Sequence, residues 1–179
     1  MGKKLFAFAM VAALALMLVG CGGSGAGSSK NSNDSVIMHE VYCTDTGDGY
    51  IDYQIVYYKS NSHVLKAVAA LTQFEKVEGL TQEYLETFDY DTIFPNLSKL
   101  AFASKDIYDD GDYYTIIIRF NDLDVKQNIQ QLHDNGILEL IDRNVDNVDA
   151  DSLMSLMESE GAQKISSADY AKLGLAAYL

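Results

Sequence analysis

The segment that decides the fold is SKDIYDDGDYYTIIIRF, residues 104–120. Two runs rich in β-branched and aromatic residues flank DDGD, residues 109–112, and an Asp-Gly pair supplies the positive φ angles of a tight β-turn. Residues 104–108 and 113–120 are therefore expected to pair as an antiparallel hairpin. Alternation along the second run directs four side chains toward the core: Tyr114, Ile116, Ile118 and Phe120.

Two more strands are expected upstream, over residues 35–44 and 50–58, joined by turn residues. In the second, the odd-numbered residues from 51 to 57 are apolar or aromatic, whereas Asp52 and Gln54 point to the other side, a pattern typical of a half-buried strand. Residues 62–77 fit two structures. Their alanines favour a helix, but Val64, Val68, Ala70 and Phe74 also suit one face of a long strand, and periodicity alone does not decide between them.

Helices are expected after Thr81, around Pro95, after Asp124, and after Asp149 or Asp151. Residues 162–165 suggest an edge strand, residues 137–141 an apolar turn or short strand, and residues 166–179 are at best weakly helical.

This order predicts an α+β domain, in which an antiparallel β-sheet of four to five strands has its helices packed on one face. The other face, which would carry Asp52, Gln54 and Arg119, is expected to be partly open to water.

The amino terminus predicts where the protein goes. Lys3 and Lys4 precede an uncharged run over residues 5–20 that is too short for a membrane span but typical of a secretory signal. Leu18-Val19-Gly20-Cys21 resembles the lipobox of bacterial lipoproteins. That resemblance implies that the leader is cleaved before Cys21 and that its thiol carries diacylglycerol.

Four parts are therefore expected: a cleaved lipoprotein signal peptide (1–20), a lipidated cysteine with a Gly/Ser-rich tether (21–35), a single α+β domain (36–165) and a C-terminal tail (166–179). The tether is expected to be flexible because it has no apolar residue larger than alanine. The predicted location is the cell membrane on its extracytoplasmic side, either the outer leaflet of a single-membrane cell or facing the periplasm.

Composition limits the partners. The chain has 179 residues, 13 Lys+Arg against 26 Asp+Glu, and a formal charge of −13. Nucleic acid is excluded as a partner because phosphates are neutralised by clustered Lys and Arg. Both cysteines lie within the first 43 residues, so a disulfide scaffold is not expected. With Cys21 lipidated, Cys43 is interpreted as a small buried side chain in a strand.

Motifs for chemistry are sparse. Residues 44–51 resemble an EF-hand fragment that lacks its key carboxylates, and the acidic groups around residues 106–112 and 142–151 are explained by turns and helix caps. Nucleophile and phosphate-binding motifs are missing from the sequence. We therefore predict no catalytic, metal or cofactor-binding residue and no enzymatic activity. Two alternatives to a non-catalytic protein remain: a weak calcium-binding envelope protein, or a hydrolase that uses scattered carboxylates.

Tyrosine supplies the one lead to a binding surface. The chain has 12 tyrosines and no tryptophan, and many of the tyrosines fall in predicted strands. A tyrosine-lined face could bind an envelope protein or a small ligand, because each ring is apolar with a polar tip; strand propensity explains the same enrichment. Tyr50, Tyr58 and Tyr113 are the candidate surface residues.

The layout as a whole resembles the small YehR-like family of bacterial lipoproteins of unknown function. The likeness rests on YYKSNSHVLKAVAALTQFEKV (57–77), TQEYLETF (81–88), SKDIYDDGDYYTIIIRFNDLDV (104–125) and ADSLMSLMESEGAQKI (150–165). It implies that residues 62–77 form a strand, and it carries over Cys21 alone as a site. The sequence therefore predicts a membrane-anchored, non-catalytic binding or interaction module.

Overall fold

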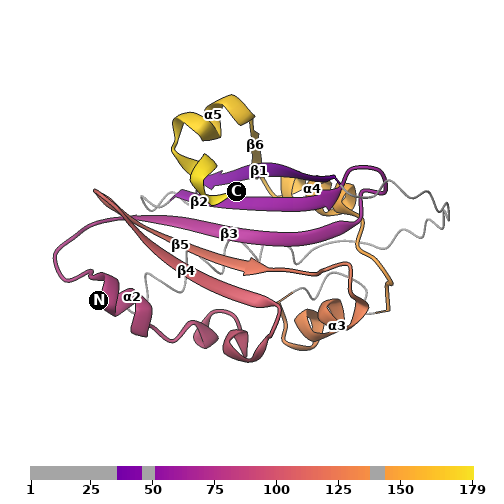
Figure 1. The fold of residues 1–179 in the computed structure, drawn as a ribbon, viewed down its shortest axis with the longest axis horizontal. Helices are drawn as coiled ribbons and strands as arrows, with labels where there is room; N and C mark the ends of the chain where they lie inside the picture. Colours follow the sequence, from indigo (N-terminus) through magenta and orange to yellow (C-terminus); the bar gives the residue numbers. More distant parts are fainter. Residues whose placement is uncertain (1–35, 46–50, 138–143) are drawn as a thin grey trace.

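The computed structural model describes residues 36–45, 51–137 and 144–179. Its centre is a six-stranded sheet (Figure 1), in the order β4-β5-β3-β2-β1-β6, with every neighbouring pair antiparallel. The strands are β1 (Ile37–Asp45), β2 (Ile51–Lys59), β3 (Leu65–Glu75), β4 (Ala103–Asp110), β5 (Tyr113–Phe120) and β6 (Gln163–Ile165).

The α+β prediction is confirmed, with six strands in place of the four to five expected. Residues 65–75 form β3 at the centre of the sheet, which settles the ambiguous segment as a strand. A strand with neighbours on both sides satisfies its backbone groups completely, and this outweighs the helix propensity of its alanines. Residues 163–165 add the sixth strand by pairing with Val41, Tyr42 and Cys43.

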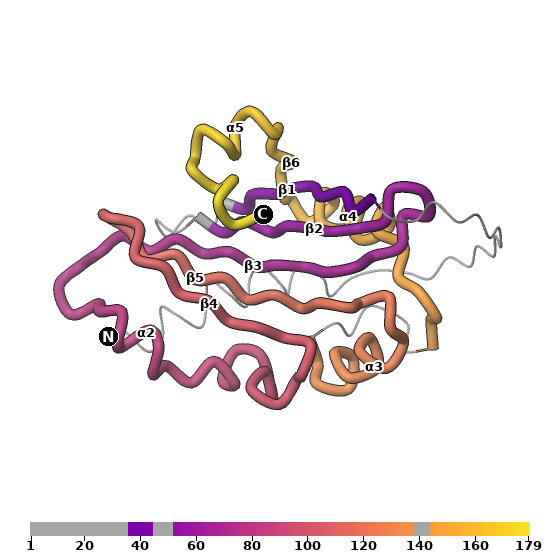
Figure 2. The backbone as a smooth tube through the Cα atoms, viewed as in Figure 1, coloured from indigo at the N-terminus to yellow at the C-terminus, as the bar shows by residue number. Residues whose placement is uncertain are grey.

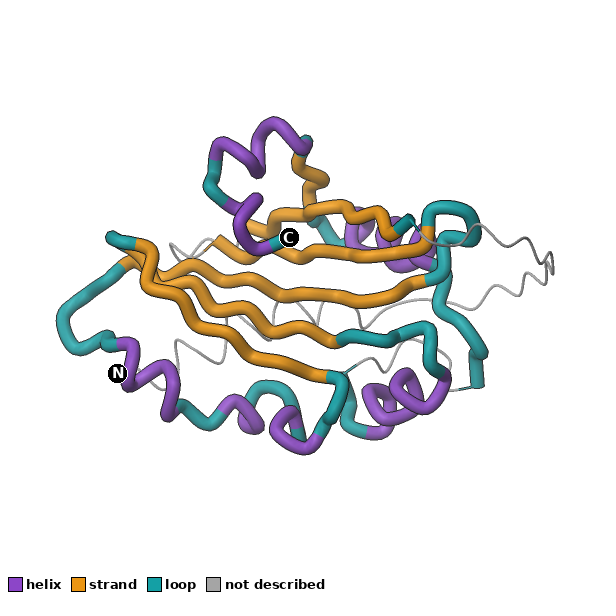
Figure 3. Tube along the Cα trace, viewed as in Figure 1, coloured by secondary structure: helices purple, strands orange, loops and turns teal. Residues whose placement is uncertain are grey.

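The four described helices are α2 (Gln82–Thr87), α3 (Lys126–Asp134), α4 (Ala150–Ser159) and α5 (Ser167–Lys172), with 3₁₀ turns at η1 (Tyr90–Thr92), η2 (Leu97–Lys99) and η3 (Leu175–Tyr178). Figure 3 shows the turns from α2 to α3 following one another along the β4 side of the sheet. No helix in this described part of the chain is long and apolar enough to cross a membrane.

Local capping chemistry explains two of these helix starts. The Thr81 side chain accepts a hydrogen bond from the Tyr84 amide, and Asp149 accepts one from the Ser152 amide. Asp124 does not cap α3 as predicted, because its carboxylate pairs with Lys66 at 2.6 Å and Lys59 at 3.4 Å.

The region around Pro95 differs from its prediction too. Residue 95 lies between the two 3₁₀ turns η1 and η2 and does not open an α-helix.

The sheet is covered on both faces, which corrects the prediction that helices pack on one face only. Leu85 of α2, Ile129 of α3 and Leu153 of α4 belong to the larger core, on one face. On the other face, Leu175 and Tyr178 of η3 close a smaller core over β1, β2, β3 and β5. Figure 2 shows this C-terminal segment, in yellow, lying over β1 and β2.

The prediction for the second sheet face is therefore wrong in two respects. Asp52 and Gln54 are 1% and 4% exposed, and they share the strand face of Val56 and Tyr58, which belong to the larger core. Arg119 lies on the opposite face, beside the C-terminal segment. Neither face is open where these residues lie: helices cover the face of Asp52 and Gln54, and residues 166–179 fold back over the face of Arg119.

Candidate functional site

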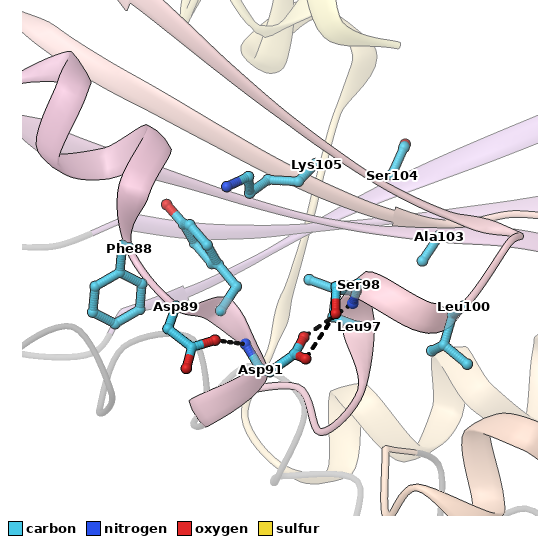
Figure 4. A pocket seen from close by; sticks show the side chains of 10 residues that line it. Phe88, Asp89, Asp91, Leu97, Ser98, Leu100, Ala103, Ser104 and Lys105 are labelled. Carbon is cyan, nitrogen blue, oxygen red and sulfur yellow. Dashed lines mark hydrogen bonds between the residues drawn. The ribbon is translucent and has the colours of Figure 1, made fainter.

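A cavity of about 270 Å³ opens beside β4, at the edge of the sheet farthest from β6 (Figure 4). Its walls come from three consecutive stretches of chain: residues 88–91, residues 97–100 except Lys99, and residues 103–105. The cavity is close in size to the smallest pockets that hold small-molecule ligands, which begin near 300 Å³. It is therefore a candidate binding site formed by described residues.

Short-range hydrogen bonds fix the wall opposite β4. The Asp89 carboxylate accepts a hydrogen bond from the Asp91 amide at 3.1 Å and so starts the 3₁₀ turn η1. The Asp91 carboxylate in turn accepts bonds from the amide and the hydroxyl of Ser98, at 2.9 and 2.8 Å. These bonds, the amide first, lower the pKa of Asp91. Both carboxylates are thus held in place, and Asp91 stays ionised at neutral pH.

Tyr90 gives the cavity a buried hydroxyl. Its side chain is 4% exposed, and its ring meets Phe88 edge-on at 5.0 Å. Within the described chain its hydroxyl has no hydrogen-bond partner. Burial, with the nearby Tyr84, raises the pKa of the Tyr90 hydroxyl, so it stays a neutral donor. A buried hydroxyl without a partner destabilises the fold by roughly 1–3 kcal/mol.

Lys105 gives the cavity its positive charge. It extends from β4, and its ammonium lies 4.2 Å from the centre of the Tyr90 ring, a cation–π distance. The same ammonium donates a hydrogen bond to the Glu86 carbonyl at 3.2 Å. Loss of water around it lowers the pKa of Lys105, against a weaker opposing effect of Glu86.

The chemistry of these walls suits binding better than catalysis. Neither histidine nor cysteine lines the cavity. The Ser98 hydroxyl donates to the Asp91 carboxylate, but the lowered pKa of Asp91 makes this carboxylate a weak base. A nucleophilic mechanism needs a hydroxyl or thiol activated by an adjacent base. The lining residues comprise one cation, two carboxylates, three hydroxyl-bearing side chains and two aromatic rings.

The structure does not bring the predicted tyrosine surface together. Tyr58 is 7% exposed and packs in the larger core, where its ring lies 5.4 Å from that of His63. Tyr113 is 46% exposed and pairs with Glu75 at the far end of β3 from Leu65, the partner of Tyr58. Tyr50 and the lipidation candidate Cys21 lie outside the described residues.

Several other tyrosines hold the C-terminal segment against the sheet. The ring of Tyr178 packs 5.1 Å from Tyr108, and its hydroxyl donates a hydrogen bond to Asp110. The Tyr170 hydroxyl lies 3.1 Å from a ring nitrogen of His39 on β1. Tyrosine enrichment thus serves packing between strands and the chain's own C-terminus.

Three of the acidic residues that suggested calcium binding form ion pairs with three different basic side chains. Asp106 pairs with Arg119, Asp109 with Lys76, and Asp146 with Lys126. Across residues 36–45, 51–137 and 144–179, no three His, Cys, Asp or Glu side chains are grouped so that they could hold a metal ion. Asp142, one of the predicted cluster, falls outside those ranges. The described chain thus offers no specific support for the calcium alternative.

The hydrolase alternative needs a carboxyl group with a raised pKa in a pocket that can hold substrate. Burial raises the pKa of Asp52 to about 6, against the hydrogen bond that its carboxylate accepts from the Thr72 hydroxyl at 2.6 Å. Asp52 faces the larger core, however, and does not line the cavity. Its raised pKa resembles that of a catalytic acid, but Asp52 does not lie at the cavity, where a substrate could reach it.

Cys43 lies in β1, between Tyr53 of β2 and Gln163 of β6. Its side chain is partly buried and packs against the smaller core. This placement is close to the packing role predicted for it.

Sequence reasoning missed both Tyr90 and Lys105. Their contact joins a 3₁₀ turn to an edge strand, and no spacing rule connects the two. One signal was available: Lys105 is the single lysine in an otherwise acidic stretch, KDIYDDGD, residues 105–112. Such a charge at the start of an edge strand is ordinarily explained as protection against edge-to-edge pairing.

Comparison with known proteins gives likeness at the level of fold. The solved NMR structure of the E. coli YehR protein superposes with a TM-score of 0.53 at 8% identity, over 76% of this chain and 95% of that one. An NMR structure of a protein from Streptococcus pneumoniae TIGR4 matches with a TM-score of 0.48 at 15% identity, over 82% of this chain and 96% of that one. No family model and no curated protein matches the sequence. The resemblance to YehR therefore holds for the fold.

Proposed function

We propose that this protein is a lipid-anchored, extracytoplasmic binding module that takes a small ligand into the cavity beside β4. Support for the anchor comes from the sequence: two lysines, an uncharged run over residues 5–20, and a lipobox-like LVGC ending at Cys21. Two or three fatty chains at that cysteine would hold the protein to a bilayer durably, whereas a single chain would not.

The charge of the chain is consistent with this role. With its excess of acidic residues the domain is repelled by an anionic membrane surface. The lipid alone would keep it at the membrane, and the folded body would remain free to meet solutes.

The main support for a binding role is the contact between Lys105 and Tyr90, which both line the cavity. The Lys105 ammonium lies over the ring of a tyrosine whose own hydroxyl is buried without a partner in the described chain. Burying the Tyr90 hydroxyl and the Lys105 ammonium there does not stabilise the fold. A ligand that accepts hydrogen bonds from both would recover the cost of burying them.

The anchor is tested by metabolic labelling with radioactive palmitate in bacterial cells. The wild-type chain is expected to take up label and to sediment with membranes. Cys21→Ala should abolish both, whereas Cys43→Ala, the matched control at the only other cysteine, should change neither. Label that persists in Cys21→Ala, or is missing from wild type, would rule out the proposed anchor.

The binding role has its own test, because it does not depend on the lipid. The full-length protein, purified in detergent, is titrated with a library of small polar molecules while the methyl and amide NMR signals of residues 97–105 are followed. Saturable shifts confined to this region are the expected result. A library that leaves all of these signals unchanged would contradict the binding role.

A further inference from the structure

In the part of the chain that the structure describes, Lys105 and Lys99 are the two lysines with no carboxylate within ion-pair distance. Each of the six other lysines there contacts at least one carboxylate: Lys59, Lys66, Lys76, Lys126, Lys164 and Lys172. Lys99 is exposed and donates to the side-chain oxygen of Asn96 at 2.9 Å, whereas Lys105 is half-buried. The hydrogen-bond acceptor of Lys105 is a neutral carbonyl. Because a desolvated cation is costly, this site is suited to an incoming anion.

The buried hydroxyl of Tyr90 adds a second donor to the same place. The ring that carries this hydroxyl also has the Lys105 ammonium over its face. Ser104, next to Lys105 on β4, lines the cavity, but it pairs with Arg119 and its side chain points to the opposite face of the sheet from that of Lys105. The ammonium and the hydroxyl are thus two donors at one tyrosine ring, and a carboxylate accepts several hydrogen bonds at once.

The other side of the cavity has the opposite character. Figure 4 shows Asp89 and Asp91 across the cavity from Lys105 and Ser104. Asp91 is committed to Ser98 through both oxygens, and Asp89 uses one oxygen for the Asp91 amide. One Asp89 oxygen thus remains to accept from a ligand, and the negative charge of this wall favours an ammonium there.

The two walls together discriminate between ligand classes. A phosphate ester would place two negative charges near Asp89 and Asp91 and be repelled. A neutral sugar would leave the Lys105 charge uncompensated. A small molecule with one carboxylate and one ammonium complements both walls, and the cavity volume of about 270 Å³ suits a molecule of that size.

We infer that the cavity binds a free α-amino acid, whose carboxylate is held by Lys105 and Tyr90 and whose ammonium faces Asp89. This inference rests on the proposed binding role and narrows it to a zwitterionic ligand.

The test is isothermal titration calorimetry of the full-length protein in detergent, with each standard amino acid as the probe. At least one is expected to bind saturably. Its N-acetyl derivative and the amine that lacks its carboxyl group should each bind about tenfold more weakly or worse, because each has lost one charge-assisted contact. Equal affinity for the amino acid and both derivatives would overturn the inference.

Variants connect the affinity to these side chains. Lys105→Met keeps most of the stem and removes the charge, so it should weaken binding by about tenfold or more. Lys99→Met, an exposed lysine on the neighbouring turn that does not line the cavity, should leave binding unchanged. Tyr90→Phe should weaken binding severalfold without lowering the melting temperature, which separates a ligand contact from a folding defect.

The possible failures are distinguishable. If no amino acid binds but inorganic phosphate or glucose produces saturable shifts at residues 97–105, the ligand class is wrong and the binding role stands. If Lys105→Met and Lys99→Met behave alike toward a bound amino acid, that amino acid binds elsewhere and the inference falls. If nothing in either panel binds, the binding role and the inference fail together.

Discussion

The guanidinium of Arg119, on β5, donates a hydrogen bond to the backbone carbonyl of Tyr178, 2.8 Å away and second to last in the chain. A second guanidinium nitrogen donates to the Asp106 carboxylate at 2.8 Å. One side chain therefore fastens the C-terminal segment to the sheet and neutralises an acid on the edge strand. Both contacts lie on the face that closes the smaller core.

Replacing Arg119 is expected to loosen this closure. Arg119→Gln removes a charge-assisted hydrogen bond to a carbonyl and leaves Asp106 unpaired, so the free energy of unfolding should fall by about 1–3 kcal/mol. Urea denaturation of the full-length protein measures the change. Lys172→Gln is the control, because its pair with Asp169 is exposed on both sides and should contribute under about 0.5 kcal/mol. Equal effects of the two variants would contradict the role given to Arg119.

The C-terminal segment should also stabilise the fold by burying apolar surface. Leu175 is 1% exposed in the smaller core, whereas Leu173, two residues earlier, is 48% exposed. Leu175→Ala should therefore lower the free energy of unfolding by about 2–4 kcal/mol, and Leu173→Ala should change it little. Thermal and urea unfolding of both variants provide the comparison. A small effect at Leu175 would mean that residues 166–179 are not packed as described.

Asp52 should make stability depend on pH in a defined window. Its pKa is about 6 in the folded protein and near 3.8 without the fold, so the folded state holds the proton more tightly. The stability due to the neutral carboxyl is complete below pH 3.8 and is lost as pH rises toward 6. The loss is about 3 kcal/mol at most.

Asp52→Asn isolates this effect from other titrating groups. The difference in unfolding free energy between the variant and wild type should grow from pH 4 to pH 6 in favour of the variant and then level off. Asp112→Asn, in the exposed turn between β4 and β5, should show no such trend. A flat difference for Asp52→Asn across the window would refute the assignment.

Removing the Tyr90 hydroxyl is expected to stabilise the fold, unlike the substitutions at Arg119 and Leu175. Its hydroxyl is buried without a partner in the described chain, so Tyr90→Phe should raise the free energy of unfolding by up to about 1 kcal/mol. Tyr113→Phe, at a ring that is 46% exposed, should have almost no effect. Chemical denaturation without ligand measures both. Destabilisation by Tyr90→Phe would show that the hydroxyl has a partner in the free protein.

The sequence predicted those parts of the fold that depend on residues close together in the chain. The hairpin at residues 104–120 and the caps Thr81 and Asp149 depend on turn and helix-end chemistry within a few residues. The Asp124 cap failed because two lysines from β2 and β3 take its carboxylate. Such competition involves residues about 60 positions away, which no local pattern reveals.

The faces of the sheet and the cavity were harder to predict for the same reason. Residues 166–179 were expected to form a loose tail because their own helix signal is weak. Their order comes from contacts with residues such as Arg119 and His39. The predicted tyrosine surface failed because alternation puts Tyr58 on a face that helices cover. The cavity depends on Lys105 meeting Tyr90, which only the folded chain brings together.

The strand order has a consequence for how the molecule is presented. The described chain enters through β1, and β4 lies four strands away at the opposite margin, about 19 Å across at the usual spacing. Attachment at the leading end of β1 would therefore leave the cavity beside β4 four strands away from the point of attachment. A solute could then arrive and depart without passing between the protein and its support.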